Sequence, residues 1–148
     1  MINAKEAFGI TEKANYEKDK NYVEKLITSS ANDFGYVLHM SSLEIEHLDN
    51  ILKELGCIYN KETFAISLTQ YVAKDSFMGE LVSNVEKQKN ELLKSAEEAI
   101  RKSANNCHRS VVFSSSANKY QNQWVIEKLL THDFDACMNQ EGDIVIYW

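Results

Sequence analysis

The sequence predicts an α+β protein built as a tandem duplication, in which one unit of helix, strand, second helix and hairpin occurs twice. Four short blocks recur in the same order in the two halves of the chain. Each half also opens with a long run of helical apolar spacing and ends with two short apolar runs around an asparagine-containing turn. We therefore expect two long helices, small sheets and a pseudo-twofold relation between the halves.

The order of the recurring blocks is stronger evidence than their identity, which is low. The pairs are 30–33 with 103–106, 37–42 with 111–116, 48–52 with 126–130, and 63–68 with 143–148. The spacing between paired blocks grows along the chain, which places insertions in loops, where they are tolerated. We assign 1–70 to the first repeat unit, 71–79 to a linker and 80–148 to the second repeat unit, together forming one compact domain.

In the first unit, a helix with a weak apolar stripe precedes a strand at 36–40. The stripe consists of Ala14, Val23, Leu26, Ile27 and Ala31. Ser41 and Glu44 are spaced for a capping box at the start of a second helix, which Gly56 is placed to end. That helix is expected to bury Leu43, Leu48, Ile51, Leu52 and Leu55. A hairpin of 57–59 and 63–68 closes the unit.

In the second unit, the long helix is expected over 78–106, followed by a strand at 110–114. Its stripe is Leu81, Val85, Leu92, Ala96 and Ala99, with Val82, Leu93 and Ile100 beside it. The narrow, alanine-rich face predicts close helix packing, or a helix that protrudes and finds a partner. The second helix carries Trp124, Val125, Leu129 and Leu130, and a hairpin of 136–138 and 143–148 follows. Because a lone hairpin is marginal in water, we expect the two hairpins to share one sheet or to pack face to face.

Composition excludes several classes of protein. Apolar residues make up 44% of the chain, which is typical of a folded domain. The net charge of −6 argues against nucleic-acid binding, which usually needs a basic face. No window approaches the apolar length of a membrane span, and the first residues do not resemble a signal peptide. We therefore expect no membrane partner and a location in a cytoplasm.

No catalytic, cofactor or metal site is expected from the residues. His39 is interpreted as a partly buried structural histidine, and Cys57 and Cys137 as equivalent structural cysteines of the two units. Cys107 and His108 are adjacent, but no second ligand pair is spaced to complete a zinc site. The chain also lacks the glycine-rich phosphate motifs and the nucleophile elbow.

Two sets of residues are candidates for binding. Ser41, Ser42, Ser115 and Ser116 precede expected helix starts, where free amides and hydroxyls can hold an anion. Capping of the helices explains the same serines equally well. Tyr120 and Trp124 lie at i and i+4, so they would form a partner contact if both face outward.

The second half resembles small uncharacterised proteins of tailed bacteriophages, which end in a strand of the pattern Gly-x-Ile-x-Ile-x-Trp. The matching residues are Ser110-Val111-Val112, the stretch 130–134, and Gly142-Asp143-Ile144-Val145-Ile146-Tyr147-Trp148. The usual residue before the final tryptophan is serine, and this chain has Tyr147. The resemblance implies a phage origin and no particular activity.

Three functions from different classes are compatible with these observations. The first, which we favour, is a non-enzymatic phage protein that acts by protein–protein interaction, as a virion structural or assembly component. Its partners would be other copies of the chain, in a homo-oligomer, or a phage or host protein. The second is an anti-defence protein that inhibits a host immune enzyme or sequesters a nucleotide signal. The third is a small enzyme of unknown type.

Overall fold

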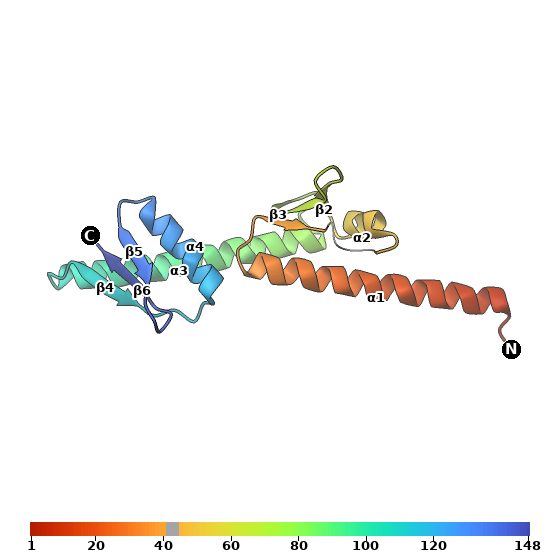
Figure 1. Ribbon diagram of the computed structural model, residues 1–148, viewed down its shortest axis with the longest axis horizontal. Coiled ribbons are helices and arrows are strands. Elements are labelled where there is room, and N and C mark those ends of the chain that lie inside the picture. Colours follow the sequence, from red (N-terminus) through yellow and green to blue (C-terminus); the bar gives the residue numbers. More distant parts are fainter. Residues whose placement is uncertain (41–44) are drawn as a thin grey trace. The chain divides into compact units, whose positions relative to one another are not determined.

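The computed structural model describes residues 1–40 and 45–148 and confirms the α+β class. This part of the chain holds four helices and two small antiparallel sheets of three strands each. In chain order the elements are α1 (Ala4–Asn32), β1 (Val37–His39), α2 (Leu48–Glu54), β2 (Cys57–Asn60), β3 (Ala65–Tyr71), α3 (Phe77–Asn105), β4 (Ser110–Phe113), α4 (Lys119–Leu130), β5 (Asp135–Met138) and β6 (Ile144–Tyr147) (Figure 1). The chain divides into unit 1 (Met1–Ser83) and unit 2 (Asn84–Trp148), with the division inside α3.

Both units have the order helix, strand, helix, strand, strand, as the sequence predicts. The sheets are ordered β1-β3-β2 and β4-β6-β5, so the last strand of each unit lies in the middle. The expectation that the two hairpins share one sheet is wrong. Each hairpin instead pairs with the first strand of its own unit, because this satisfies both edges of the central strand locally.

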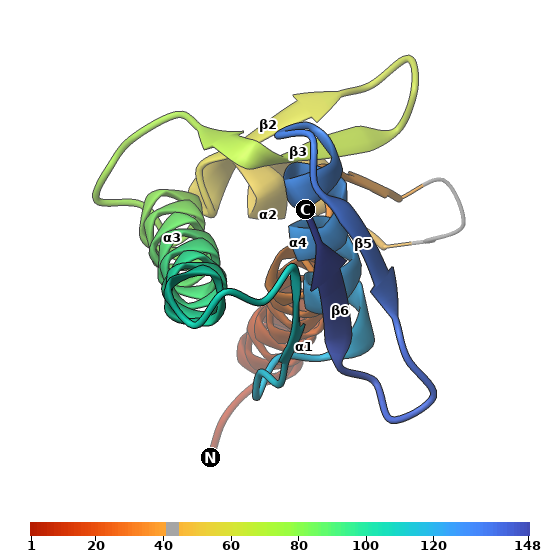
Figure 2. The same cartoon turned by 90° about the vertical axis from the view of Figure 1, so that its left-hand side faces the viewer.

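The inner face of each central strand supplies the centre of its unit's core. In β3, Ile66 and Leu68 are buried, and in β6, Ile144 and Ile146 are buried. The buried positions alternate with more exposed ones, as expected for a sheet with one covered face. Helix α1 contacts β3, α2 contacts β2, and α4 contacts β5, as Figure 2 shows for unit 2.

Helix α1 is only partly covered. Val23, Ile27 and Ala31 are fully buried, which confirms the C-terminal part of the predicted stripe. Ala14 is exposed, so the stripe is shorter than predicted. The reason is visible in Figure 1, where the N-terminal turns of α1 extend beyond β2, β3 and α2 of the same unit. A capping box between Asn3 and Glu6 starts the helix.

Helix α2 begins later than the sequence suggests. The capping box proposed for Ser41 and Glu44 lies outside the described residues, and the described helix starts after His47, whose backbone is left-handed. Ile51, Leu52 and Leu55 are buried, as predicted. Gly56 ends the helix with φ +76°, and a Cβ there would collide with Ser76, so only glycine fits.

An ion pair and a hydrogen bond hold α2 against α1. The Lys20 ammonium lies 2.7 Å from Glu54 Oε1, and the Tyr16 hydroxyl donates to Glu54 Oε2 at 2.7 Å. The Lys20 ammonium and the Tyr16 hydroxyl both favour the charged carboxylate, so they lower the pKa of Glu54 below its ordinary value.

The helices of unit 2 follow the predicted pattern with two differences. On α3, Val85 and Ala96 are buried as expected, but Lys89 is also buried within the same stripe. At α4, the cap is Asn118, whose side chain accepts from the amides of Tyr120 and Gln121, so the preceding serines do not cap this helix. No helix in the described ranges combines the length and the apolar character needed to cross a bilayer.

Alanine substitutions in the covered and in the uncovered part of α1 should change the free energy of unfolding by different amounts. Ile27→Ala should lower the free energy of unfolding by about 2–4 kcal/mol, because it leaves a cavity in the core. Ile10→Ala, in the same helix but with a side chain 61% exposed, should change it by less than about 0.5 kcal/mol. Urea unfolding followed by circular dichroism measures both values, and equal losses would contradict the assigned core.

Two glycines with open space around them should respond in opposite directions to alanine. Gly142 has φ +89°, so Gly142→Ala should lower the stability of unit 2 by about 1 kcal/mol through backbone strain alone. Gly9 lies within α1 with nothing near its Cα, so Gly9→Ala should stabilise the local helix by about 0.5–1 kcal/mol. Amide hydrogen exchange in β6 measures the change caused by Gly142→Ala, and exchange in α1 measures the change caused by Gly9→Ala. If both substitutions stabilised, or both destabilised, the backbone conformations assigned to the two glycines would be wrong.

Candidate functional site

In unit 2, charged and aromatic side chains meet between α3 and α4, around Trp124; this region is called the seam below. The indole of Trp124 is only 8% exposed. The Lys89 ammonium lies 5.3 Å from the centroid of its ring, and the Lys128 ammonium lies 5.5 Å from it. Both distances are within the range of attraction between a cation and an aromatic face. Trp124 of α4 is therefore linked to α3 through the ammonium of Lys89.

Lys89 is a buried cation at a position where helical spacing predicts an apolar residue. It is 4% exposed, and its ammonium pairs with Glu86 at 3.1 Å on the same helix. Burial of a charge is costly unless the charge has partners, which Glu86 and the Trp124 ring supply here. The side chain of Lys89 thus connects α3 to the Trp124 ring of α4.

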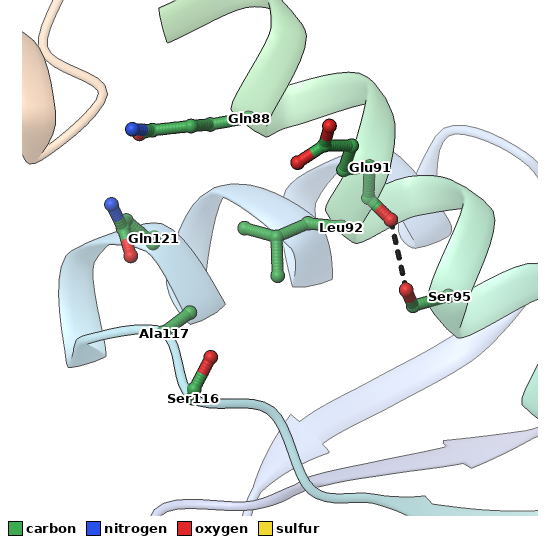
Figure 3. A pocket seen from close by; sticks show the side chains of 7 residues that line it. All are labelled: Gln88, Glu91, Leu92, Ser95, Ser116, Ala117 and Gln121. Atoms are coloured by element: carbon green, nitrogen blue, oxygen red, sulfur yellow. Dashed lines mark hydrogen bonds between the residues drawn. The ribbon is translucent and has the colours of Figure 1, made fainter.

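A polar groove of about 400 Å³ lies near the start of α4. Its lining residues are Gln88, Glu91, Leu92, Ser95, Ser116, Ala117 and Gln121. Figure 3 shows Leu92 pointing from α3 toward Ala117, while the Ser95 hydroxyl is bonded to the Glu91 carbonyl of its own helix at 3.0 Å. The charged side chain in this lining is the carboxylate of Glu91, so the groove favours a neutral or cationic polar group over an anion.

The serines proposed as anion contacts have other roles where they are described. The Ser115 hydroxyl donates to Asn122 Oδ1 at 2.7 Å and accepts from the Ala117 amide, so it holds the buried Asn122 in place. Ser116 lines the polar groove opposite Glu91. Ser41 and Ser42 lie outside the described residues.

An apolar groove of about 450 Å³ lies at the other end of α4. Its lining residues are Leu93, Glu97, Ile100, Arg101, Lys128, Leu129, His132 and Phe134. The ring of Phe134, one of the lining residues, meets the Trp148 ring edge-on, with centroids 6.4 Å apart. Arg101 pairs with Glu97 along α3. Sequence reasoning did not identify this groove, although the i, i+7 spacing of Leu93 and Ile100 beside the main stripe was its signal.

The predicted aromatic contact is only half present. Tyr120 is 54% exposed, and the Lys119 ammonium lies 4.9 Å from the centroid of its ring. Trp124 is buried beneath Lys89 and Lys128, so the two aromatic rings do not form an outward-facing pair. Trp124 is instead a structural part of the seam.

Two interpretations of single residues need correction. His39 is exposed, with Nδ1 3.4 Å from the Thr63 carbonyl oxygen, because its strand position faces away from the core. Cys57 is buried while Cys137 is exposed, so they are not equivalent. Cys137 opposes Val145, which lies between the buried positions of β6, and a shift of one residue in register places a side chain on the opposite face.

Unit 1 carries one surface cluster of potential metal ligands among its described residues. Ligand atoms of Glu12, Glu46 and His47 lie within 4.8 Å of one another. All three residues are exposed, and Glu46 already pairs with His47 at 3.4 Å. Water competes for such exposed groups, so the cluster does not define a binding centre.

No protein-family model, characterised protein or solved structure matches this chain. The function is therefore inferred from the surfaces described above.

The different burial of the cysteines predicts different reactivity. Burial raises the pKa of the Cys57 thiol to about 12, so its reactive thiolate is scarce near neutral pH. Cys107 and Cys137 are exposed. At about pH 8, iodoacetamide should modify these two at least about a hundredfold faster than Cys57 in the folded protein. Peptide mass spectrometry measures the rates. All three should react alike in denaturant, and equal rates in the folded chain would contradict the structure.

Proposed function

We propose that this chain is a non-enzymatic protein of a tailed bacteriophage that acts by binding other protein chains, as a virion structural or assembly component. The observation that carries the proposal is the uncovered N-terminal part of α1. Ile2, Phe8 and Ile10 are 60%, 66% and 61% exposed within the first ten residues. Ile2 lies just before α1, and Phe8 and Ile10 lie on different sides of its first turns, so large apolar side chains are exposed around this end of the helix, which is typical of an interaction surface.

The length of the uncovered segment supports this proposal energetically. Residues 4–15 are almost all exposed, so this part of α1 gains little from tertiary packing. Helical segments of about this length are marginal in water by themselves. A partner that covers Phe8 and Ile10 would gain about 1.5–3 kcal/mol for each side chain that becomes fully buried.

The duplication and the pseudo-twofold relation belong to the same proposal. They are supported by the shared element order and by the shared strand order of the two sheets. The hairpin turns are also similar. Asn60 Oδ1 accepts from the amides of Glu62 and Thr63, and Asn139 Oδ1 accepts from the amides of Glu141 and Asp143. The second bonded amide lies three residues after the asparagine in one turn and four residues after it in the other, but an asparagine-centred turn in both hairpins favours descent of the units from one ancestor.

The phage origin is supported by the resemblance of the C-terminal strand to small phage proteins. The resembling residues form β4 and β6, which pair with each other throughout. The amide of Trp148 donates to the Arg109 carbonyl at 3.1 Å, and its ring packs against Phe134. Trp148 thus extends the backbone pairing at the end of β6 and packs against Phe134, a lining residue of the apolar groove. On this proposal the protein acts in the host cytoplasm or within the virion.

Removal of the exposed apolar side chains of α1 should weaken association. The double variant Phe8→Ala/Ile10→Ala should raise the dissociation constant of the self-complex, or of the complex with a phage or host protein, at least about tenfold. Size-exclusion chromatography with light scattering measures self-association, and mass spectrometry of purified particles detects incorporation. The matched control is Val72→Ala, which removes another side chain that is 73% exposed and should change neither result.

A wild-type chain that stays monomeric at high concentration and is absent from particles would contradict the proposal. Association that is unaffected by the α1 substitutions would contradict the assignment of the surface.

A further inference from the structure

We propose that the apolar groove of unit 2 binds a free amphiphile with a single anionic head, of the class of medium-chain carboxylates. This inference goes beyond the proposed function, because it concerns a small ligand and a different surface from α1. The argument rests on the floor of the groove, on its size and on the charges at its rim.

The floor of the groove is made of side chains without polar groups. Leu93 and Ile100 are half-buried on α3, Leu129 is buried on α4, and Phe134 follows that helix. They come from different elements of the same unit, so the floor is a concave surface and not a single exposed side chain. The volume of about 450 Å³ is within the range of pockets that hold small molecules.

The rim of the groove carries more positive than negative charge. The lining holds the basic side chains of Arg101 and Lys128 and the imidazole of His132, and Glu97, which pairs with Arg101, is its carboxylate. The whole chain has a net charge of −6, so this rim has the opposite sign to the protein that carries it. A mixed surface with an apolar floor and a positive rim is complementary to an apolar body that ends in one negative charge.

The geometry assigns separate roles to the two ends of the ligand. The ammonium of Lys128 is held beside Trp124, at the seam between the helices, where it can meet a carboxylate at the edge of the groove. Arg101 lies on the opposing helix with its partner Glu97. The apolar chain of the ligand would then lie along Leu93, Ile100 and Leu129. Pairing of the head with Lys128 would set the preference for an anion, because Arg101 is already paired with Glu97.

The test compares three ligands with the same apolar body and different heads. Decanoate, decanol and decyltrimethylammonium are titrated into the full chain by calorimetry, at concentrations below those at which they self-associate. Decanoate should bind at least about fivefold more tightly than decanol, a ratio equivalent to one exposed ion pair, and decyltrimethylammonium should bind most weakly.

Matched variants separate the roles of rim and floor. Lys128→Gln should bring the decanoate to decanol ratio close to one, while Lys128→Arg should retain it. Lys102→Gln removes a cation from the exposed surface of α3 outside the groove and should leave the ratio unchanged. Ile100→Gln should weaken both ligands at least about tenfold, because it places an amide in the floor. Leu130→Gln, at a residue 50% exposed outside the lining, is its control.

Circular dichroism confirms that each variant is folded before its binding is compared. The inference is overturned if the three ligands bind equally, if none binds, or if Lys128→Gln leaves the preference for decanoate intact. Binding of an acidic amphipathic peptide without binding of decanoate would also overturn it, because the groove would then be a protein contact. None of these results depends on whether α1 mediates association.

Discussion

The constraint on which the rest of this structure depends is the need to bury one face of each central strand. In β3 the pair Ile66 and Leu68, and in β6 the pair Ile144 and Ile146, are excluded from water almost completely. A strand in the middle of a sheet must also pair its backbone on both sides. The flanking strands meet the second requirement, and the helices of the same unit meet the first. The helix, strand, helix and hairpin order is a compact way to satisfy both within one short stretch of chain.

The long helices α1 and α3 extend further than is needed to cover the buried face of a central strand. Their additional length provides the uncovered part of α1 and the grooves beside α3. A helix of 29 residues extends about 43 Å, whereas β1 has three residues and β6 has four. In unit 1 the excess appears as the uncovered N-terminal turns of α1. In unit 2 residues of α3 line both grooves, one with the segment before α4 and its first turn, the other with the last turn of α4 and the segment after it. The grooves differ in character because one is lined by amides, hydroxyls and a carboxylate, and the other by apolar side chains with a basic rim.

Local periodicity predicted the elements well, and it was less successful for the faces of single residues. The long helix over 78–106 and the strand at 110–114 were found within a residue of their expected positions, because repeating apolar spacing depends on sequence alone. The exposed His39 and the unequal cysteines were not predicted, because a register shift of one residue reverses the face of a strand side chain. The contact proposed for the case that Tyr120 and Trp124 both face outward does not form, because Trp124 is buried, with the ammonium groups of Lys89 and Lys128 near its ring.

The sequence by itself determined the fold class, the order of elements in each half and the residues that could form a core, since these follow from spacing, turn residues and capping. Only the tertiary structure decided that each hairpin pairs with the first strand of its own unit, and that Leu93, Ile100, Leu129 and Phe134 meet in one groove. These four residues come from α3, from α4 and from the segment after α4, so no local pattern brings them together. Contacts between residues distant in sequence depend on how the packed elements meet, which is a property of the whole unit.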